Sequence, residues 1–441
     1  MKIAVFGLGK LGSVMAAVYA AAGHEVVGVD ISAKNVAAIN SGVAPVSEPS
    51  LQDLLDEAGS RLSATTEVSV ALRDSEVSYI IVPTPSDDKG VFTNKYVNQA
   101  LSDIGEELRT SERRHTIVIC STVMPGSCHG DLTAALEMAS GKVVGEEIGL
   151  VYSPEFIALG SIVKNMHFPD VILIGESDAE SGAIAEKNAL SVAQNTPSVQ
   201  RMNLVNAEIV KLSINTFVTT KISFANMLSE ICDHMPGADV DVVTEAVGSD
   251  SRIGTKYLRG ALGYGGPCFP RDNVALTRLA DSFGVDAAIP RATDAINNRQ
   301  ATRVLELVSE MTEPGATVAI LGLSYKPDTS VCEMSQGVEL ANKLLAVGFT
   351  VVAHDPQADR STAPNLNSGV EFISELDGAV NRASTVVLTT AWPEFQSLTS
   401  EQLHGKFVVD AWGILGSELP TSRLGKLQSS VTYKSMANQD V

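Results

Sequence analysis

A glycine-rich turn between two short apolar segments constrains the fold of this chain more than any other feature. Residues 2–6 are apolar and rich in β-formers, Gly7-Leu8-Gly9-Lys10-Leu11-Gly12 follows, and residues 11–22 have a helix-forming composition. A second apolar segment, residues 26–29, ends at Asp30. A strand, a tight turn, a helix and a second strand in this order predict a parallel βαβ unit.

The spacing of these glycines predicts a dinucleotide site. Glycines allow the backbone to approach a pyrophosphate, which then lies at the positively polarised N-terminus of the helix. A carboxylate at the tip of the second strand accepts a hydrogen bond from a ribose 2′-hydroxyl and repels a 2′-phosphate, which favours NAD over NADP. The alternative is a glycine turn that binds no ligand. The predicted cofactor-binding residues of this segment are Gly7, Gly9, Lys10, Leu11, Gly12 and Asp30.

Strand signals alternate with helical segments through the first half of the chain. They recur at residues 77–82, 116–120 and 148–151. Such alternation is typical of a doubly wound parallel sheet with helices on both faces. We therefore expect an N-terminal NAD-binding domain over residues 1–198.

The pattern changes after residue 199, where strand signals fade. Residues 206–233 carry helical apolar spacing over a length that suits a spine joining two lobes. A second α/β pattern occupies residues 315–323, 337–347, 350–353, 385–390 and 407–410. The sequence thus predicts an α/β protein with two doubly wound domains, joined by a long central helix and a helical middle domain over residues 199–300. The second α/β domain spans 301–441, and its last twenty or so residues show little pattern.

The charge balance restricts the partners of this chain. Its 441 residues include 32 Lys plus Arg and 52 Asp plus Glu, a net charge of −20. So acidic a surface repels phosphate backbones and anionic lipid, and we expect neither a nucleic-acid nor a membrane partner. No uninterrupted apolar run reaches about 18 residues. Lys10 and the glycines interrupt the run that resembles a signal peptide, which favours a cytoplasmic protein.

The cysteines indicate a reactive thiol rather than a disulfide framework. The five are scattered, and no His/Cys cluster has zinc spacing, so we expect no metal site. Cys268 lies in Gly263-Tyr264-Gly265-Gly266-Pro267-Cys268-Phe269-Pro270-Arg271-Asp272. Gly-Gly-Pro forces an irregular loop that exposes the thiol, and Arg271 with a nearby helix start favours the thiolate. The alternative is a buried structural cysteine.

The Cys268 segment resembles the nucleophile loop of the UDP-glucose/GDP-mannose dehydrogenase family. Other segments agree with the family in order, namely residues 82–85 (VPTP), 121–126 (STVMPG), 153–156 (SPEF), Lys211 with Asn215, 250–254 (DSRIG) and 322–327 (GLSYKP). The resemblance implies two Rossmann-like domains and a central helix that also forms a homodimer interface. It further implies NAD-dependent oxidation of a sugar nucleotide's C6 alcohol to the uronic acid, a reaction of polysaccharide biosynthesis.

The resemblance also implies catalytic roles. Cys268 would be the nucleophile that forms a thioester. Lys211 would stabilise the oxyanion, and Asn215 would assist as a donor. Asp272 and Thr122 would hold a water or take up protons, and Glu155 would activate the hydrolytic water. Lys211 could instead be a solvated helix residue, Glu155 a first-turn acid, and Thr122 a strand-end cap.

Binding roles follow from the same resemblance. Besides the glycine turn and Asp30, the expected cofactor-binding residues are Thr84, Pro85, Thr122 and Glu155. The expected substrate-binding residues are Phe156, Ile157, Lys211, Asn215, Arg252, Tyr264, Gly265, Tyr325, Lys326 and Trp412. Arg252, from the neighbouring subunit, and Lys326 supply local cations for an anionic ligand.

Departures from the family pattern concern the substrate. Leu159 stands where the family has an acid, Glu333 stands where it has Arg, and Trp412 replaces a cation. UDP-glucose is the leading substrate, with GDP-mannose or a UDP-N-acetylhexosamine as alternatives. Two rival functions are a two-electron hydroxyacid dehydrogenase, which has no use for Cys268, and a silent NAD-binding regulator. We further expect Trp412 to lie near the substrate rather than in the core.

Overall fold

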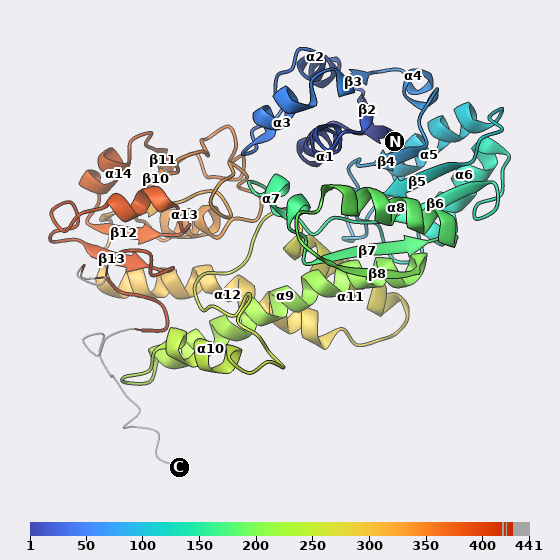
Figure 1. Cartoon of the computed structure of the whole chain (residues 1–441). Coiled ribbons are helices and arrows are strands. Elements are labelled where there is room, and N and C mark those ends of the chain that lie inside the picture. Colours follow the sequence, from blue (N-terminus) through green and yellow to red (C-terminus); the bar gives the residue numbers. More distant parts are fainter. Residues whose placement is uncertain (417–418, 420, 427–441) are drawn as a thin grey trace. The chain divides into compact units, whose positions relative to one another are not determined.

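The chain forms two compact units, residues 1–213 and 214–441, in a computed structural model (Figure 1). The structure describes residues 1–416, 419 and 421–426. The patternless last residues of the sequence, from 427 onward, lie outside this part of the chain. Each unit is built around its own sheet.

The first unit contains an eight-stranded sheet in the order β3-β2-β1-β4-β5-β6-β7-β8. Its strands are β1 (Lys2–Phe6), β2 (Glu25–Val29), β3 (Leu62–Thr65), β4 (Val77–Ile80), β5 (His115–Ile119), β6 (Ile148–Tyr152), β7 (Val171–Glu176) and β8 (Ser198–Asn203). All neighbouring pairs are parallel except β6 and β7, which run antiparallel. The sheet order reverses beside β1, as in doubly wound folds.

Helices cover both faces of this sheet, and each face has its own apolar core. The helices and helical turns are α1 (Lys10–Ala21), α2 (Ala33–Asn40), α3 (Leu51–Ala58), η1 (Gly59–Arg61), α4 (Val68–Leu72), α5 (Lys95–Leu108), η2 (Cys128–Leu132), α6 (Thr133–Ser140), α7 (Ile162–His167) and α8 (Ala179–Val192). The predicted βαβ unit is therefore confirmed as β1-α1-β2.

The sheet extends beyond the predicted end of the N-terminal domain. β8 begins at Ser198 and pairs with β7 through Asn203. The sequence gives no apolar signal there, because β8 is an edge strand whose residues are mostly exposed and polar. The sequence also missed β3 and β7, and the antiparallel joint departs from the wholly parallel sheet that we expected.

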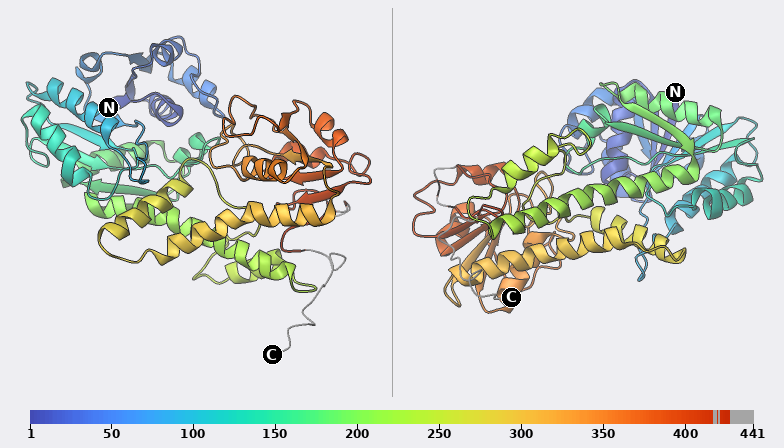
Figure 2. Two further views of the ribbon diagram at one scale, coloured as in Figure 1. Left: turned by 180° about the vertical axis from the view of Figure 1, so that it is seen from behind. Right: turned by 90° about the horizontal axis from the view of Figure 1, so that it is seen from below.

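The second unit combines long helices with a smaller sheet. Its helices are α9 (Leu204–Asp233, which begins in the first unit), α10 (Val240–Gly248), α11 (Phe269–Ser282), α12 (Ala288–Met311), α13 (Gln336–Ala346) and α14 (Leu376–Arg382), with the turn η3 (Pro393–Ser397). At 30 residues α9 is about 45 Å long. The expected long helix is thus present, and α12 runs beside it (Figure 2).

The sheet of the second unit is parallel and has the strand order β11-β10-β9-β12-β13. Its strands are β9 (Thr317–Leu321), β10 (Thr350–His354), β11 (Glu371–Phe372), β12 (Thr385–Leu388) and β13 (Phe407–Asp410). Apolar clusters lie on both of its faces. The α/β architecture with two Rossmann-like sheets is confirmed.

No helix in the described part of the chain has the length and apolarity needed to cross a membrane. Among the residues that the structure describes, no group of three or more His, Cys, Asp and Glu side chains is placed to hold a metal ion.

Candidate active site

The glycine turn combines close packing with one open position. Gly7 has φ +95°, and a Cβ there would overlap with the Ile81 carbonyl oxygen. A Cβ on Gly12 would overlap with the Gly7 carbonyl oxygen. By contrast, apart from its two chain neighbours, no described residue has an atom within 4 Å of a Cβ built on Gly9, the N-cap residue of α1. Gly7 and Gly12 therefore pack the turn against the sheet, while Gly9 leaves room at the helix N-terminus for a phosphate group.

Asp30 lies at the tip of β2 and fixes the same turn. Its Oδ2 accepts from Leu8 N at 2.6 Å, and its Oδ1 accepts from Ser32 N at 2.7 Å. Each carboxylate oxygen has two lone pairs, so Asp30 can accept further hydrogen bonds. Lys10 is exposed, and Leu11 packs against the core.

The ends of β4 and β5 meet beside this turn. Thr84 Oγ1 donates to the Thr122 carbonyl oxygen at 2.6 Å, and Ser121 Oγ donates to the Val82 carbonyl oxygen at 2.7 Å. These bonds join the two segments after β4 and β5, while Pro85 stays exposed. A glycine turn at a helix N-terminus, an acid at the next strand tip and hydroxyls at the switch point fit a dinucleotide.

Lys211 of α9 contacts the segment that follows β6. Its Nζ donates to the Glu155 carbonyl oxygen at 2.7 Å and lies 4.4 Å from the centre of the Phe156 ring. The side chain of Lys211 is buried, so the ammonium is held in a fixed place rather than in solvent. Ile157, the next residue of the segment, is half-buried and packs against the core.

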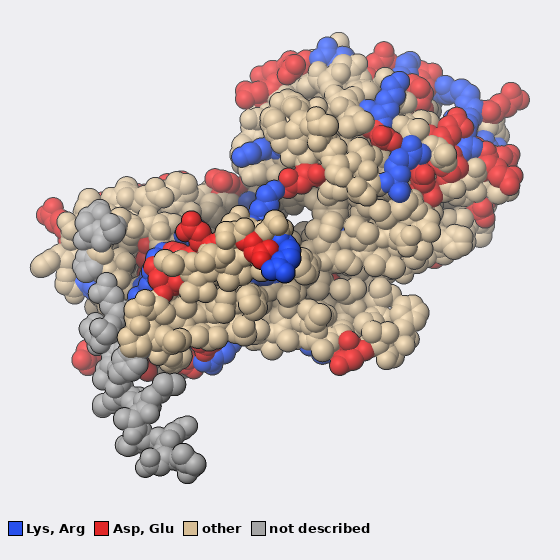
Figure 3. All heavy atoms as spheres, turned by 60° about the horizontal axis from the view of Figure 1, so that its bottom comes forward, with Lys and Arg blue, Asp and Glu red and all other residues tan. Residues whose placement is uncertain are grey.

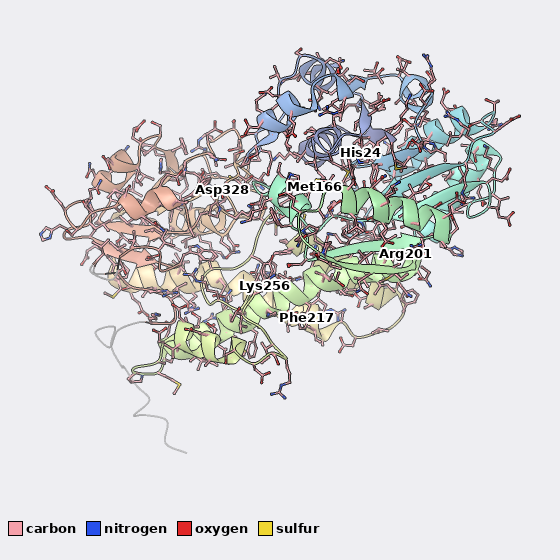
Figure 4. The ribbon with its side chains drawn as sticks, in the orientation of Figure 1. His24, Met166, Arg201, Phe217, Lys256 and Asp328 are labelled. Carbon is pink, nitrogen blue, oxygen red and sulfur yellow. The ribbon has the colours of Figure 1, made fainter. Side chains whose placement is uncertain are left out.

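Glu155 lines a small cavity of about 30 Å³ together with Tyr19 of α1 and Met166 of α7. Met166 is labelled in Figure 4. Burial raises the pKa of Glu155 to about 7, and the charge of Lys211 opposes that rise. A carboxyl with a pKa near neutrality can exchange protons at physiological pH, as a general base must.

Two further carboxylates anchor the loops of the first unit, and sequence analysis missed both. Glu208 is fully buried on α9, one turn before Lys211, and accepts from Gly126 N at 2.6 Å and Cys128 N at 2.7 Å. Glu48 accepts from Gly160 N at 2.8 Å and Ile162 N at 2.6 Å. The sequence signal for Glu208 was an acid within the helical apolar spacing of residues 206–233, and we used that spacing only to predict a helix.

The second unit presents Cys268 at the start of a helix. Cys268 is the N-cap residue of α11 and is exposed, as the loop pattern predicted. Its carbonyl oxygen accepts from Asp272 N at 2.9 Å. The Asp272 carboxylate is buried and accepts from Asn215 Nδ2 at 2.6 Å. Because α9 carries Asn215 and α11 carries Asp272, this bond joins the two helices.

The predicted substrate residues of the second unit fall into two groups. Gly265 and Gly266 pack tightly on Tyr325: a Cβ on Gly266 would lie 2.6 Å from the Tyr325 ring, and Gly266 N donates to the Glu333 carbonyl oxygen at 2.9 Å. The loop after β9 and the Cys268 loop therefore lie side by side.

The second group consists of Lys326, Arg252 and Trp412. Lys326 is half-buried, and its Nζ donates to the Pro327 carbonyl oxygen at 3.3 Å. Arg252 is exposed and forms an ion pair with Asp250 at 2.6 Å. The Trp412 indole is half-buried against the core, and its Nε1 donates to the Thr389 carbonyl oxygen at 2.9 Å. This packing is what a structural indole would show, so a substrate role for Trp412 stays a prediction.

Asp355 occupies in the second sheet the place that Asp30 has in the first. Its Oδ2 accepts from Leu323 N, from Ser324 N and Oγ, and from Trp392 Nε1 at 2.7–3.2 Å. Its Oδ1 accepts from Gln357 N and Ala358 N. Since the carboxylate is buried and saturated by the chain itself, it has no capacity left for a ribose.

Comparison with protein families divides the chain into three matched segments. The UDP-glucose/GDP-mannose dehydrogenase family's NAD-binding domain matches residues 1–189, its central domain matches 205–299, and its UDP-binding domain matches 319–417.

Individual relatives match over nearly the full chain. A UDP-glucose 6-dehydrogenase of Haloferax volcanii is 34% identical, covering 96% of this chain and 98% of its own. A GDP-mannose 6-dehydrogenase of Azotobacter vinelandii is 33% identical, covering 94% and 97%. Among solved structures, a UDP-glucose dehydrogenase from Pyrobaculum islandicum has a TM-score of 0.85 at 33% identity, with 93% of each chain covered.

Proposed function

Because this chain belongs to the UDP-glucose/GDP-mannose dehydrogenase family, an NAD-dependent class of oxidoreductases, we propose that it oxidises the C6 alcohol of a sugar nucleotide to the carboxylate. The observation that carries the proposal is the exposed thiol of Cys268 at the N-terminus of α11, beside the buried Asn215–Asp272 pair. A thiol in this position serves covalent catalysis, because a helix N-terminus favours the thiolate.

The proposed reaction consists of two oxidations and one hydrolysis. NAD, when bound, accepts a hydride in each oxidation. The alcohol first loses a hydride and a proton to become an aldehyde. The Cys268 thiolate adds to C6, the oxyanion takes a proton, and loss of a second hydride and a proton leaves a thioester. Water then cleaves the C–S bond, which returns the thiol and releases the carboxylate.

We propose for these residues the roles that the family resemblance implies, and the contacts of Lys211 and the pKa of Glu155 support two of them. Lys211, held as an ammonium between Glu155's carbonyl and the Phe156 ring, stabilises the oxyanions. Asn215 donates to the same oxygen, and Asp272 with Thr122 handles water and protons. Glu155 takes the proton of the hydrolytic water, which suits a carboxyl with a pKa of about 7.

We propose UDP-glucose as the substrate, because its dehydrogenases are among the relatives over nearly the full chain and the matched C-terminal model is a UDP-binding domain. GDP-mannose is the alternative that the relatives support. Leu159 and Glu333 depart from the family at positions that we associate with the sugar and the nucleotide. A turnover screen against a panel of sugar nucleotides distinguishes these substrates.

Counting NADH per sugar nucleotide consumed tests the reaction. We expect two NADH per sugar, whereas a hydroxyacid dehydrogenase would give one and a silent regulator none. Cys268→Ser keeps the size of the side chain but replaces a thiolate with a hydroxyl that is barely ionised at neutral pH. We expect that variant to bind NAD and sugar nucleotide but to lose the second oxidation. Two NADH per sugar at near wild-type rate from Cys268→Ser would overturn the thioester route.

We also propose that two copies associate through α9 in the cytoplasm. Phe217, Phe224, Met227 and Ile231 are exposed and spaced by seven, three and four residues, so they form one apolar stripe. Phe217 is labelled in Figure 4 and is 67% exposed. In Figure 3, charged side chains are sparse in the middle and lower right of the view and dense at its upper right. Apolar stripes of this kind mark protein interfaces.

A further inference from the structure

Two buried asparagines hold the segment that leads to Cys268. We propose that Asn297 of α12, together with Asn226 of α9, positions the Cys268 loop for aldehyde capture. The inference rests on the proposed function, since it concerns how the chain places its nucleophile. Neither asparagine contacts the reacting atoms in this scheme, so both are positioning residues.

Each asparagine pairs with the backbone through both ends of its carboxamide. Asn226 Oδ1 accepts from Ala261 N at 2.9 Å, and its Nδ2 donates to the Leu262 carbonyl oxygen at 3.2 Å. Asn297 Oδ1 accepts from Tyr264 N at 2.7 Å, and its Nδ2 donates to the Tyr264 carbonyl oxygen at 3.0 Å. Both side chains are buried. Residues 261–264 therefore receive from two helices the hydrogen bonds that a neighbouring strand would otherwise supply.

The fit between this segment and α12 is tight. A Cβ on Gly263 would overlap with Asn297 Oδ1, so only glycine allows the backbone this close to the carboxamide. The register of the segment is consequently fixed by two bonds on each side of Gly263.

Tyr264 transmits this placement to Cys268. Its hydroxyl donates to Asp294 Oδ1 at 2.5 Å and accepts from Asn273 Nδ2 at 2.9 Å. Burial raises the pKa of Tyr264, and the bond to Asp294 adds to that rise, so the hydroxyl stays protonated. Its ring also meets the Phe269 ring edge-on, with centroids 6.2 Å apart.

The contacts of Tyr264 link the residues before Cys268 with the residues after it. Phe269 follows Cys268 directly, and Asn273 lies one turn further along α11. Because Tyr264 is fixed by Asn297 and in turn contacts both residues, a shift of Tyr264 displaces the start of α11. Cys268, which lies between Tyr264 and Phe269, moves with it.

The two oxidations depend differently on this placement. The first oxidation forms the aldehyde without the thiol, whereas the second requires the Cys268 sulfur within bonding reach of C6. A small displacement from the productive geometry costs a large factor in rate. Loss of the asparagine bonds should therefore slow the second oxidation and leave the first nearly unchanged.

The experiment compares Asn297→Ala with Gln300→Ala in the full-length enzyme. Gln300 is a buried carboxamide one turn further along α12, and its hydrogen bonds go to the Ile296 carbonyl oxygen and to Arg303. The readouts are NADH per sugar, aldehyde trapped with hydroxylamine, and the rate of oxidation of added aldehyde. For Asn297→Ala we expect aldehyde oxidation to fall about tenfold or more, since both bonds that fix Tyr264 are lost and the thiol is displaced from C6. NADH per sugar should fall from two toward one, with KM for NAD unchanged.

Two more variants keep the inference falsifiable if Asn297→Ala fails to fold. Gly263→Ala retains Asn297 but pushes its carboxamide away, and Asn226→Ala removes the other pair of bonds; both should show the same preferential loss. The inference is wrong if all these variants slow both oxidations in equal proportion, as Gln300→Ala would. A wild-type count other than two NADH would instead refute the proposed function. Two NADH for wild type and for every variant would refute the inference alone.

Discussion

Glu155 is a single carboxyl group whose environment decides when it can act as a base. Its pKa of about 7 means that it is half protonated near neutral pH. If Glu155 activates the hydrolytic water, thioester hydrolysis should rise about tenfold per pH unit below pH 7 and level off above it. Glu155→Gln should abolish this dependence and accumulate the thioester after a burst of NADH. Mass spectrometry of the Cys268 peptide checks the adduct, and its absence would contradict the role.

The same pKa gives Glu155 a pH-dependent effect on stability. Because burial raises the pKa above the unfolded value, the native state binds the proton more tightly than the unfolded state does. Its contribution is fully present below about pH 4.3 and is lost as the pH rises to about 7. Glu155→Gln should therefore gain in melting temperature relative to wild type between pH 5 and pH 7, with no further gain above. Thermal unfolding across this range measures the difference.

Asp30 and Asp355 offer a matched pair of strand-tip acids. Asp30→Ala should weaken NAD binding about tenfold or more and reduce the preference over NADP, because a charged hydrogen bond to the ribose and a repulsive charge are lost. Asp355→Ala should leave KM for NAD unchanged but lower the stability of the second unit, because six bonds from the chain lose their acceptor. Equal effects of the two changes on NAD affinity would contradict this assignment.

Among single residues, sequence analysis identified those whose role is indicated by their immediate neighbours in the sequence. Cys268 stands out because Gly-Gly-Pro precedes it, and Asp30 because a strand ends there. Glu208, Asn226 and Asn297 were missed because each lies inside a helix, and their backbone partners are distant in sequence. Whether a buried polar residue finds such a partner depends on tertiary packing.

Among the elements, the β1-α1-β2 unit provides a test that separates folding from binding. Gly12→Ala should unfold or strongly destabilise the first unit, since the new Cβ would overlap with backbone. Gly9→Ala should keep the melting temperature, because the new Cβ meets no described residue beyond its chain neighbours, but should raise KM for NAD. Thermal unfolding and NAD titration of both variants check this contrast. Normal NAD binding by Gly9→Ala would show that the open position is not used.

Element prediction succeeded where burial leaves an apolar run. β9, β10, β12 and α13 were found within a few residues of their bounds because they are core elements. β8 was missed because an edge strand needs few apolar residues. β7 is a buried apolar run that sequence analysis overlooked, and only its antiparallel pairing with β6 has no local signature. Strand direction is decided by the connection that returns the chain, which local sequence does not specify.

For the whole molecule, the stripe on α9 predicts a dimer. Phe224, which is 44% exposed, would be buried at that interface. Phe224→Asp should therefore shift the mass in solution from dimer to monomer, because an unpaired carboxylate would be buried in apolar surroundings. Met138→Asp on α6, another exposed apolar position, is the control that should stay dimeric. Light scattering after size exclusion measures both masses, and a monomeric wild type would refute the proposal.

Molecular organisation was the easiest level to predict, because two α/β patterns and a long helical spacing occupy separate stretches of the chain. The exact domain limits stay a prediction: the change of pattern at residue 199 falls within β8. Because the polar composition of β8 gives no strand signal, it also gives no signal for the end of the N-terminal domain, whose last strand is β8.

The saturation of Asp355 has a consequence for the order of events. Both sheets have an acid at a strand tip, but of the two acids only Asp30 in the first unit can still accept a hydrogen bond from a ribose. A four-electron oxidation needs two hydride acceptors, so both must use the same cofactor-binding site. NADH must then leave that site and a second NAD must bind between the two oxidations of each turnover. The aldehyde has to stay bound during this exchange. The rate of cofactor exchange therefore sets an upper limit on turnover, however fast the chemical steps are.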